Sequence, residues 1–474
     1  MHRLGSAEHP LRIAVVGAGP AGFFVAQHLS QRTDVATAVD LFERLPMPFG
    51  LVRYGVAPDH EEIKRVARSF EKTTAKPNVR LFANVELGAQ VTLEDLRRHY
   101  HQICLTTGAQ SDRRLGVPGE DLPGSHSATE FVAWYNGHPD YCQCTFDLSA
   151  ERAVVIGVGN VAVDVARILA RLPEDLATTD IADYALDALR RSRIREVVVL
   201  GRRGPLQAAF TPPELKELGE LNGVDVVVRP DEIELDPASQ AELERSDDRA
   251  LQRKMEILRE FAARKPSGQP RRLVLRFLVS PVDLRPAPTG RVGAIRLVRN
   301  VLRPDERGTL QAHPTGEMEE MEAGLVFRSV GYRGVPLTGV PFDERRGIVP
   351  NVAGRVLDPA TSTPIPGLYV SGWLKRGPTG VIGTNKPDAA ETVKVMLEDA
   401  ARIACLSPDA PEPAAAEALI RARCPRFLSY GDWRRIDELE CERGKPAGRP
   451  RVKYTSVEEA EAALLREMRV RGSG

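Results

Sequence analysis

The sequence predicts an α/β protein that contains two similar units, and three observations carry this prediction. A short apolar run rich in β-branched residues, Arg12–Val16, leads directly into a glycine-rich turn and then into apolar residues at helical spacing up to Leu29. The same order of strand, glycine turn and helix begins again at Arg152–Ile156. Short apolar runs that end in glycine resume after residue 325. Alternation of this kind is typical of parallel sheets covered by helices.

The chain is long enough for several domains and carries no excess charge. It has 474 residues with 65 basic and 65 acidic side chains, so its formal charge is zero. One hydrophobic core rarely grows past about 250–300 residues, so two or three domains are expected. Electroneutrality argues against general nucleic-acid binding, which depends on a surplus of Lys and Arg. No run of about 18 apolar residues is present, so we expect no association with membranes.

The cysteines indicate a reducing compartment. There are six in this long chain, and Cys142 and Cys144 form a C-x-C pair, but no C-x-x-C occurs. This pattern argues against a disulfide scaffold, a redox dithiol and a cysteine-bound iron–sulfur cluster, and we expect no metal site. Residues Met1–Pro10 lack the basic-then-apolar layout of a signal peptide. The sequence therefore predicts a cytoplasmic location.

The first glycine turn predicts a dinucleotide site. It reads G-x-G-x-x-G, with its glycines at Gly17, Gly19 and Gly22. Such glycines allow a tight turn, a close approach of backbone to a diphosphate, and close packing of helix on strand. The next strand, about Ala38–Phe42, ends at Glu43, whose carboxylate can accept hydrogen bonds from a ribose diol. This unit is therefore expected to bind FAD or NAD, which both lack a 2′-phosphate.

The second glycine turn predicts a different dinucleotide. It reads G-x-G-x-x-A, and its expected contact residues are Gly157, Gly159, Asn160 and Val161. The next strand is followed by Arg202 and Arg203 rather than an acid, and two guanidiniums can bind a 2′-phosphate, which favours NADP. The spacing exceeds the usual gap of about 20 residues, so an insertion is expected around Leu172–Arg193. Solvated surface arginines are the alternative reading.

Long sequence blocks point to one family. They are Pro48–His60 (PFGLVRYGVAPDH), Gly159–Ala162 with Asp164, Gly201–Pro205 (GRRGP) and Gly372–Asn385 (GWLKRGPTGVIGTN). On these blocks the chain resembles the adrenodoxin-reductase-like family of ferredoxin–NADP reductases, including its mycobacterial members, from about Leu11 to Lys453. The resemblance implies two Rossmann-like dinucleotide-binding domains, with the NADP domain inserted into a discontinuous FAD domain.

The resemblance also implies domain limits. The FAD-binding domain is expected to take residues 1–109 and 325–407. The NADP-binding domain is expected at 110–324. Residues 408–474 are expected to be a linker followed by a helical C-terminal extension.

Individual site residues follow from the same resemblance. The residues that would line FAD are Ala21, Glu43, Leu51 and Val85, and those that would contact its flavin side are Trp373, Gly380, Val381 and Ile382. Three further residues match positions near the nicotinamide. Of these, Glu214 is expected to accept a hydrogen bond from the carboxamide, and His60 and Glu217 to handle protons. A loop histidine and a solvated helix face are the alternatives for His60 and Glu217.

The implied activity is NADPH–ferredoxin reduction by a monomer. NADPH would deliver a hydride to FAD, which would pass single electrons to an iron–sulfur ferredoxin. Ferredoxins are acidic, so a basic docking face is expected. Eight basic residues between 253 and 276 are candidates for it, with a solvated helix as the alternative: Arg253, Lys254, Arg259, Arg264, Lys265, Arg271, Arg272 and Arg276.

Three other functions remain open at this point. A glutamate-synthase small subunit shares the two-nucleotide layout, but it carries a cysteine-rich N-terminal region, and this chain has no cysteine before Cys104. A monooxygenase or diaphorase would not explain the long blocks. A non-catalytic FAD/NADP redox sensor would bind the same cofactors and pass no electrons on.

Overall fold

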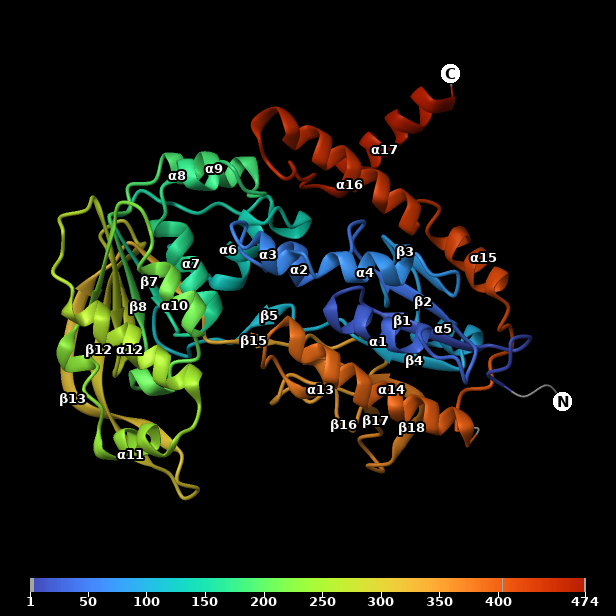
Figure 1. Cartoon of the computed structure of the whole chain (residues 1–474), viewed down its shortest axis with the longest axis horizontal. Coiled ribbons are helices and arrows are strands. Elements are labelled where there is room, and N and C mark those ends of the chain that lie inside the picture. Colours follow the sequence, from blue (N-terminus) through green and yellow to red (C-terminus); the bar gives the residue numbers. More distant parts are fainter. Residues whose placement is uncertain (1–3, 403, 473–474) are drawn as a thin grey trace. The chain divides into compact units, whose positions relative to one another are not determined.

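The chain folds into two compact units, each built around its own mainly parallel sheet. The computed structural model describes residues 4–402 and 404–472. One unit comprises the chain up to Ser111 and from Gly331 onward, and the other is Asp112–Val330. Figure 1 shows the first unit mainly in blue, orange and red, and the second in green and yellow. The predicted α/β class with parallel sheets is confirmed.

The first unit contains a seven-stranded sheet in the order β16-β17-β18-β4-β1-β2-β3. Its strands are β1 (Leu11–Val16), β2 (Thr37–Glu43), β3 (Val79–Ala83), β4 (Gln102–Leu105), β16 (Asn351–Val352), β17 (Arg355–Leu357) and β18 (Pro364–Val370). Strand β1 pairs in parallel with both β2 and β4, whereas the edge pairs β16–β17 and β17–β18 are antiparallel. Chain order reverses at β1, and in such sheets ligands bind at the carboxyl ends of the strands beside that point.

Helices cover the sheet of the first unit and continue as far as Gly472 (Figure 1). They are α1 (Pro20–Ser30), α2 (Leu51–Tyr54), α3 (Glu61–Lys64), α4 (Ala67–Thr74), α5 (Leu93–His99), α13 (Trp373–Arg376), α14 (Asn385–Ala401), α15 (Pro413–Arg423), α16 (Tyr430–Gly444) and α17 (Val457–Gly472). Two short strands, β5 (Ser111–Asp112) and β15 (Tyr332–Arg333), lie where the chain passes between the units. Ser111 donates its hydroxyl to the Arg333 carbonyl at 3.1 Å.

The C-terminal helices are part of the first unit's hydrophobic core. Ile420 of α15 is buried with residues of β4 and β18. Trp433 and Ile436 of α16 are buried in the same cluster as the apolar face of α1. The segment expected to be a linker and an extension therefore contributes to the fold of this unit.

The second unit contains six parallel strands in the order β6-β14-β7-β8-β10-β9 and a separate antiparallel sheet, β11-β12-β13. The parallel strands are β6 (Ser125–Ser127), β7 (Arg152–Ile156), β8 (Glu196–Leu200), β9 (Val224–Val228), β10 (Arg271–Arg276) and β14 (Leu325–Arg328). The antiparallel strands are β11 (Val279–Pro286), β12 (Val292–Pro304) and β13 (Leu310–Glu322). Chain order reverses at β7, which pairs with β8 and β14.

Helices of the second unit account for the expected insertion. They are α6 (Ala128–Tyr135), α7 (Asn160–Ala170), α8 (Pro173–Leu176), α9 (Asp183–Arg190), α10 (Pro212–Leu218), α11 (Pro237–Arg245) and α12 (Arg249–Ala263). Helices α8 and α9 fill the stretch between α7 and β8. Within residues 4–402 and 404–472, no helix has the length and apolar character needed to cross a membrane.

Candidate dinucleotide sites

The glycines of the first turn are required by close packing at the end of β1. Gly17 has φ +109°, and a Cβ there would lie 2.7 Å from the Thr106 carbonyl oxygen. A Cβ at Gly22 would lie 2.0 Å from the Gly17 oxygen. Thr106 donates its hydroxyl to that same oxygen at 2.8 Å. Gly19 caps α1 without a side-chain cap, so the N–H groups of the first helical turn remain available to an anion.

Glu43 reaches back from the end of β2 to this turn. Its Oε2 accepts the Ala18 N–H at 3.0 Å, and its Oε1 accepts the Leu45 N–H at 3.1 Å. Burial raises the pKa of this carboxyl above its ordinary value. Each carboxylate oxygen can accept a further hydrogen bond. Glu43 is therefore fixed beside the turn and keeps the capacity to accept ribose hydroxyls.

A second stretch of backbone faces the first turn. The Phe49 N–H donates to the Ala18 carbonyl at 2.8 Å. Gly50 has φ +50°, and a Cβ there would lie 3.0 Å from Gly19 Cα. Leu51 begins α2 directly after it. The sequence block Pro48–His60 contains this segment, but the sequence alone predicts no role for Phe49 or Gly50.

The remaining residues assigned to FAD lie on other strands and loops of the first unit. The side chain of Val85 is buried in a hydrophobic cluster, and its N–H donates to the Glu43 carbonyl at 2.8 Å. Ala21 lies against Gly372, since a Cβ at Gly372 would be 2.6 Å from that of Ala21. The Gly372 N–H donates to Asp388 at 2.6 Å. Asp388, which sequence reasoning missed, fixes the turn before Trp373.

The segment after α13 presents an apolar surface. The Trp373 ring lies 5.1 Å from that of Tyr332, and its indole N–H donates to the Thr379 carbonyl. Gly380 is exposed with φ +78°, and Val381 is 56% exposed. Ile382 packs partly against the core of the unit. An exposed valine beside exposed backbone is the kind of surface that a planar ring system covers, so the first unit fits FAD.

The second turn repeats the tight bend but leaves its backbone open. Gly157 has φ +134°, and a Cβ there would lie 2.0 Å from the Ser329 carbonyl oxygen. Gly159 caps α7, and apart from its chain neighbours no atom of residues 4–402 and 404–472 lies within 4 Å of a Cβ built on it. The helix begins here without a side-chain cap. This open cradle fits the diphosphate of a nucleotide.

Asn160 connects this turn to α10. Its Oδ1 accepts the Thr211 N–H at 2.9 Å. The Val158 carbonyl accepts the N–H groups of Ala209 and Phe210 at 2.8 and 3.1 Å. These bonds hold the start of α10, which carries Glu214 and Glu217, close to the glycine turn. The neighbouring Val161 is half-buried and packs against the core of the unit.

Arg202 and Arg203 follow β8, and elements far along the chain hold their backbone. Arg202 is exposed and Arg203 half-buried, and neither takes part in an ion pair with any residue in 4–402 or 404–472. The Asn300 side chain donates to the Arg202 carbonyl at 2.9 Å. The Leu278 N–H donates to the Arg203 carbonyl at 3.1 Å. Two guanidiniums not engaged by carboxylates fit a phosphate ligand.

Lys254 of α12 anchors the next stretch of this loop. Its Nζ is buried and donates to the carbonyls of Leu206 and Ala208 at 2.9 and 2.6 Å. Burial lowers the pKa of Lys254 to about 8. Sequence reasoning missed the roles of Lys254 and Asn300 in the loop. No sequence motif near the loop marks these two residues, because Lys254 and Asn300 lie about 50 and 100 residues further along the chain.

The three residues matched to the nicotinamide region belong to different units. His60 precedes α3 as its N-cap residue in the first unit. Glu214 and Glu217 both lie on α10 in the second unit. Glu217 Oε2 is 3.8 Å from Nε of Arg167, which also binds Asp164 at 2.5 Å. The structure brings the two glutamates together on one helix, and their roles stay predictions.

The proposed basic docking face needs correction. Lys254, Arg271 and Arg276 are buried. Arg271 donates to the carbonyls of Ala170 and Arg171, and Arg276 forms ion pairs with Glu232 and Glu319. The prediction that all eight basic residues share one surface is wrong for these three, because α12 and β10 each turn one face inward. The five exposed residues are Arg253, Arg259, Arg264, Lys265 and Arg272.

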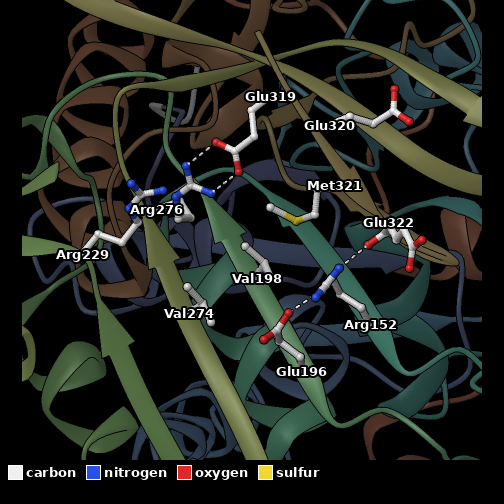
Figure 2. A pocket seen from close by; sticks show the side chains of 10 residues that line it. All are labelled: Arg152, Glu196, Val198, Arg229, Val274, Arg276, Glu319, Glu320, Met321 and Glu322. Atoms are coloured by element: carbon white, nitrogen blue, oxygen red, sulfur yellow. Dashed lines mark hydrogen bonds and ion pairs between the residues drawn. The ribbon is translucent and has the colours of Figure 1, made fainter. Parts of the chain in front are cut away.

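A groove in the second unit is separate from these sites. It has a volume of about 420 Å³ and lies between β13 and the strands β7, β8 and β10. Figure 2 shows Arg276 directed at Glu319, and Arg152 held between Glu196 and the backbone of Glu322. None of the glycine-turn residues lines it. The arginines labelled in Figure 2 are bound by carboxylates or backbone oxygens of the chain itself, so we assign no ligand site to the groove.

Comparison with known proteins identifies the family. Residues 11–248 match the pyridine nucleotide-disulphide oxidoreductase family. The chain is 48% identical to NADPH-ferredoxin reductase FprA of Mycobacterium tuberculosis, covering 95% of this chain and 98% of the relative. It is 43% identical to human mitochondrial NADPH:adrenodoxin oxidoreductase, covering 97% and 93% of the two chains.

A solved structure agrees with the sequence comparisons. The structure of Mycobacterium tuberculosis FprA in complex with NADPH matches with a TM-score of 0.89 and 47% identity, covering 96% of this chain and all of that one. Fold, site geometry and sequence thus lead to one conclusion: the chain belongs to the family of NADPH-ferredoxin and adrenodoxin reductases, within the pyridine nucleotide-disulphide oxidoreductases.

Proposed function

We propose that the protein is an NADPH–ferredoxin reductase that holds FAD in its first unit and binds NADPH in its second. One observation carries the assignment most directly. The strand after the first glycine turn ends in Glu43, which accepts the Ala18 N–H, whereas the strand after the second turn is followed by Arg202 and Arg203. A carboxylate suits a free ribose diol and repels a phosphate, while paired guanidiniums favour a 2′-phosphate.

The residues of the first unit would hold FAD by its two ends. The N–H groups at the start of α1 would bind the diphosphate, and Glu43 would accept the adenosine ribose hydroxyls. Trp373 and the segment Gly380–Ile382 would contact the flavin side. When bound, FAD supplies the chemistry that accepts two electrons as a hydride and releases them singly to an iron–sulfur centre. The protein's part is to bind, orient and shield.

The residues of the second unit would bind and orient NADPH. The open backbone at Gly159 would take its diphosphate, and Arg202 with Arg203 its 2′-phosphate. Glu214 would accept from the carboxamide and so select the face of the nicotinamide. Arg167 of α7 lies 3.8 Å from the Glu217 carboxylate, and we assign Glu217, with His60, to proton handling.

Rapid mixing of the purified yellow protein with NADPH tests the proposal. The flavin absorbance should bleach rapidly with NADPH and much more slowly with NADH. Cytochrome c reduction should then depend on added ferredoxin. A redox sensor would bleach slowly and pass no electrons on, and a diaphorase would reduce acceptors equally well without ferredoxin. A colourless protein would exclude the flavin assignment.

We propose an acidic ferredoxin as the electron acceptor, docked on a basic face that includes Arg259 and Lys265. Both are exposed near the end of α12, whereas Arg253 and Arg272 are engaged by Glu256 and Glu196. Charge reversal of Arg259 and Lys265 should raise KM for ferredoxin and leave ferricyanide reduction unchanged. An equal loss with both acceptors, or with neither, would exclude this face.

The cytoplasm is the proposed compartment. None of the six cysteines is bonded to another, and burial raises the pKa of the Cys104 thiol, so these groups suit a reducing environment. The monomeric state stays a prediction, which light scattering on the purified holoenzyme would test.

A further inference from the structure

A buried ion pair joins the C-terminal part of the chain to the segment that faces the first glycine turn. Arg53 of α2 donates through both terminal nitrogens to Glu440 of α16, at 2.9 and 2.6 Å. The Arg53 side chain is 5% exposed and that of Glu440 is fully buried. The two residues are 387 positions apart.

Further contacts surround this pair. Glu440 also accepts the Tyr454 N–H at 2.8 Å, and Lys453 Nζ donates to the Arg53 carbonyl at 3.3 Å. The Arg53 guanidinium lies 5.2 Å from the centre of the Trp433 ring. Residues from α16 and from the segment after it therefore engage both the side chain and the backbone of Arg53.

The same helix contacts the residue that precedes Gly50. The ring of Trp433 packs edge-on against Phe49, with the ring centres 5.7 Å apart. Phe49 in turn donates its N–H to Ala18 of the glycine turn. Contacts from α16 thus lie on both sides of Gly50, whose close approach to Gly19 closes that turn.

Helix α2 cannot hold this position without outside support. It spans four residues, Leu51–Tyr54. The hydrogen bonds of a single helical turn do not offset the conformational entropy that is lost when the turn forms. Gly50 also adopts a left-handed conformation. The position of Phe49–Leu51 must therefore be fixed by tertiary contacts, and the Arg53–Glu440 pair is the most directional of those present.

We propose that Glu440 is a positioning residue for the FAD site, acting through Arg53 to hold Phe49–Leu51 against the Gly17–Gly22 turn. This inference rests on the proposed function, since it requires FAD in the first unit. It assigns a role to the C-terminal segment, in which the sequence carries no recognisable chemical pattern.

Glu440→Gln tests the proposal on purified holoenzyme. The amide keeps the size of the side chain but removes the charge that binds Arg53. FAD release, followed as the rise in flavin fluorescence on dilution, should become about 10-fold faster. The visible circular dichroism of the bound flavin should change as well, because the Leu51 side of the site is no longer fixed. A role limited to overall stability would leave this spectrum unchanged.

Asp40→Asn is the matched control. Asp40 is as deeply buried in the same unit, and its partners Arg12, Arg80 and Tyr100 lie outside the 17–22 and 49–54 segments. This variant should lower the melting temperature but change the FAD release rate less than 2-fold. If the two variants release FAD at equal rates, or if Glu440→Gln releases it as slowly as the wild type, the proposal is overturned.

Lys453→Met serves as a milder second variant if Glu440→Gln does not fold. It removes one bond to the Arg53 carbonyl and leaves the buried pair intact. FAD release should become about 3-fold faster, and an unchanged rate would contradict the proposal. A wild-type protein that binds no flavin would refute the proposed function. A yellow wild type with unaffected variants would refute only this inference.

Discussion

The turn at Gly17–Gly22 is faced by a second stretch of backbone at Gly50. In the other turn, a Cβ built on Gly159 would have no atom within 4 Å in the described part of the chain, its chain neighbours aside. An enclosed turn resists ligand exchange, because the facing segment must move before a bound diphosphate can leave. An open turn allows binding and release in every catalytic cycle. The difference suits the proposed assignment of a resident FAD to the first unit and an exchanging NADPH to the second.

The rim residues of the two sites, which end or follow the strand after each glycine turn, are Glu43 in the first unit and Arg202 with Arg203 in the second. They also differ in how they are held. Glu43 lies one strand away from the first turn and bonds to it directly. Arg202 and Arg203 make no such bond, and their loop is held from outside by Asn300 and Lys254. In the proposed assignment, discrimination by Glu43 therefore depends on local structure, whereas discrimination by Arg202 and Arg203 depends on remote supports.

Exchanging the last residue of the two turns, Gly22 in the first and Ala162 in the second, should give the largest effect. Gly22→Ala places a methyl group 2.0 Å from the Gly17 oxygen, so α1 must shift. We expect a loss of about 3 kcal/mol in the free energy of unfolding and little bound flavin. Ala162→Gly in the second unit should cost only about 1 kcal/mol, by helix propensity. Flavin content per protein and chemical denaturation measure both, and a yellow, stable Gly22→Ala protein would contradict the packing argument.

Removal of both rim arginines should come next. Arg202→Ala with Arg203→Ala should raise KM for NADPH about 100-fold, since hydrogen bonds to charged groups contribute about 1.5–3 kcal/mol each. KM for NADH should stay within about 2-fold, because NADH has no 2′-phosphate. Arg191→Ala, at an exposed arginine of the same unit, is the control and should change neither value. A parallel rise for both nucleotides would place the arginines elsewhere on the cofactor.

Loss of the acid on the other rim should have a smaller effect. Glu43→Gln keeps an acceptor for Ala18 but weakens the bonds to a ribose diol. FAD release should accelerate about 10-fold, or about 1.4 kcal/mol, while KM for NADPH stays unchanged. If NADPH binding changed and FAD release did not, the assignment of the two sites would have to be reversed.

The smallest effect on cofactor binding is expected at Lys254, whose contribution to stability depends on pH. The pKa of Lys254 is about 8 in the folded protein against 10.5 in the unfolded chain. Between these values the unfolded chain binds the extra proton, so the contribution of Lys254 to stability is fully present above pH 10.5 and is lost as pH falls through 8. Relative to Lys254→Met, the wild type should therefore gain stability between pH 8 and 10.

A kinetic measurement complements this titration. Lys254→Met removes the donor to Leu206 and Ala208, and the loosened loop should raise KM for NADPH about 3-fold. A constant stability difference from pH 7 to 10 would show that the amine does not titrate in this range.

The local features of both sites could be predicted from sequence, because they depend on residues close together in the chain. Both glycine turns, Glu43, and the arginines after β8 stand where strand, turn and helix follow each other directly. The fold class could be predicted from the same local order of elements, and the structure confirms it. Domain limits and the roles of His60 and Glu217 came only through family resemblance and stay predictions.

The supports of the sites could not be predicted, because they act over long sequence distances. Asn300 reaches Arg202 across 98 residues, and Glu440 reaches Arg53 across 387. No periodicity or spacing marks such pairs. The same reason explains the error in the docking face: the basic residues from 253 to 276 look alike in sequence, but helix and strand geometry buries three of them.

The long separation between Arg53 and Glu440 has a consequence for biosynthesis. The ribosome makes the first 111 residues, then the whole of 112–330, and only afterwards α16. At about 5–20 residues per second, α16 is synthesised on the order of 20 to 80 s after the segment Phe49–Tyr54 that it contacts. We therefore expect flavin uptake to follow completion of the nascent chain, so that ribosome-bound chains stalled before residue 430 retain no flavin.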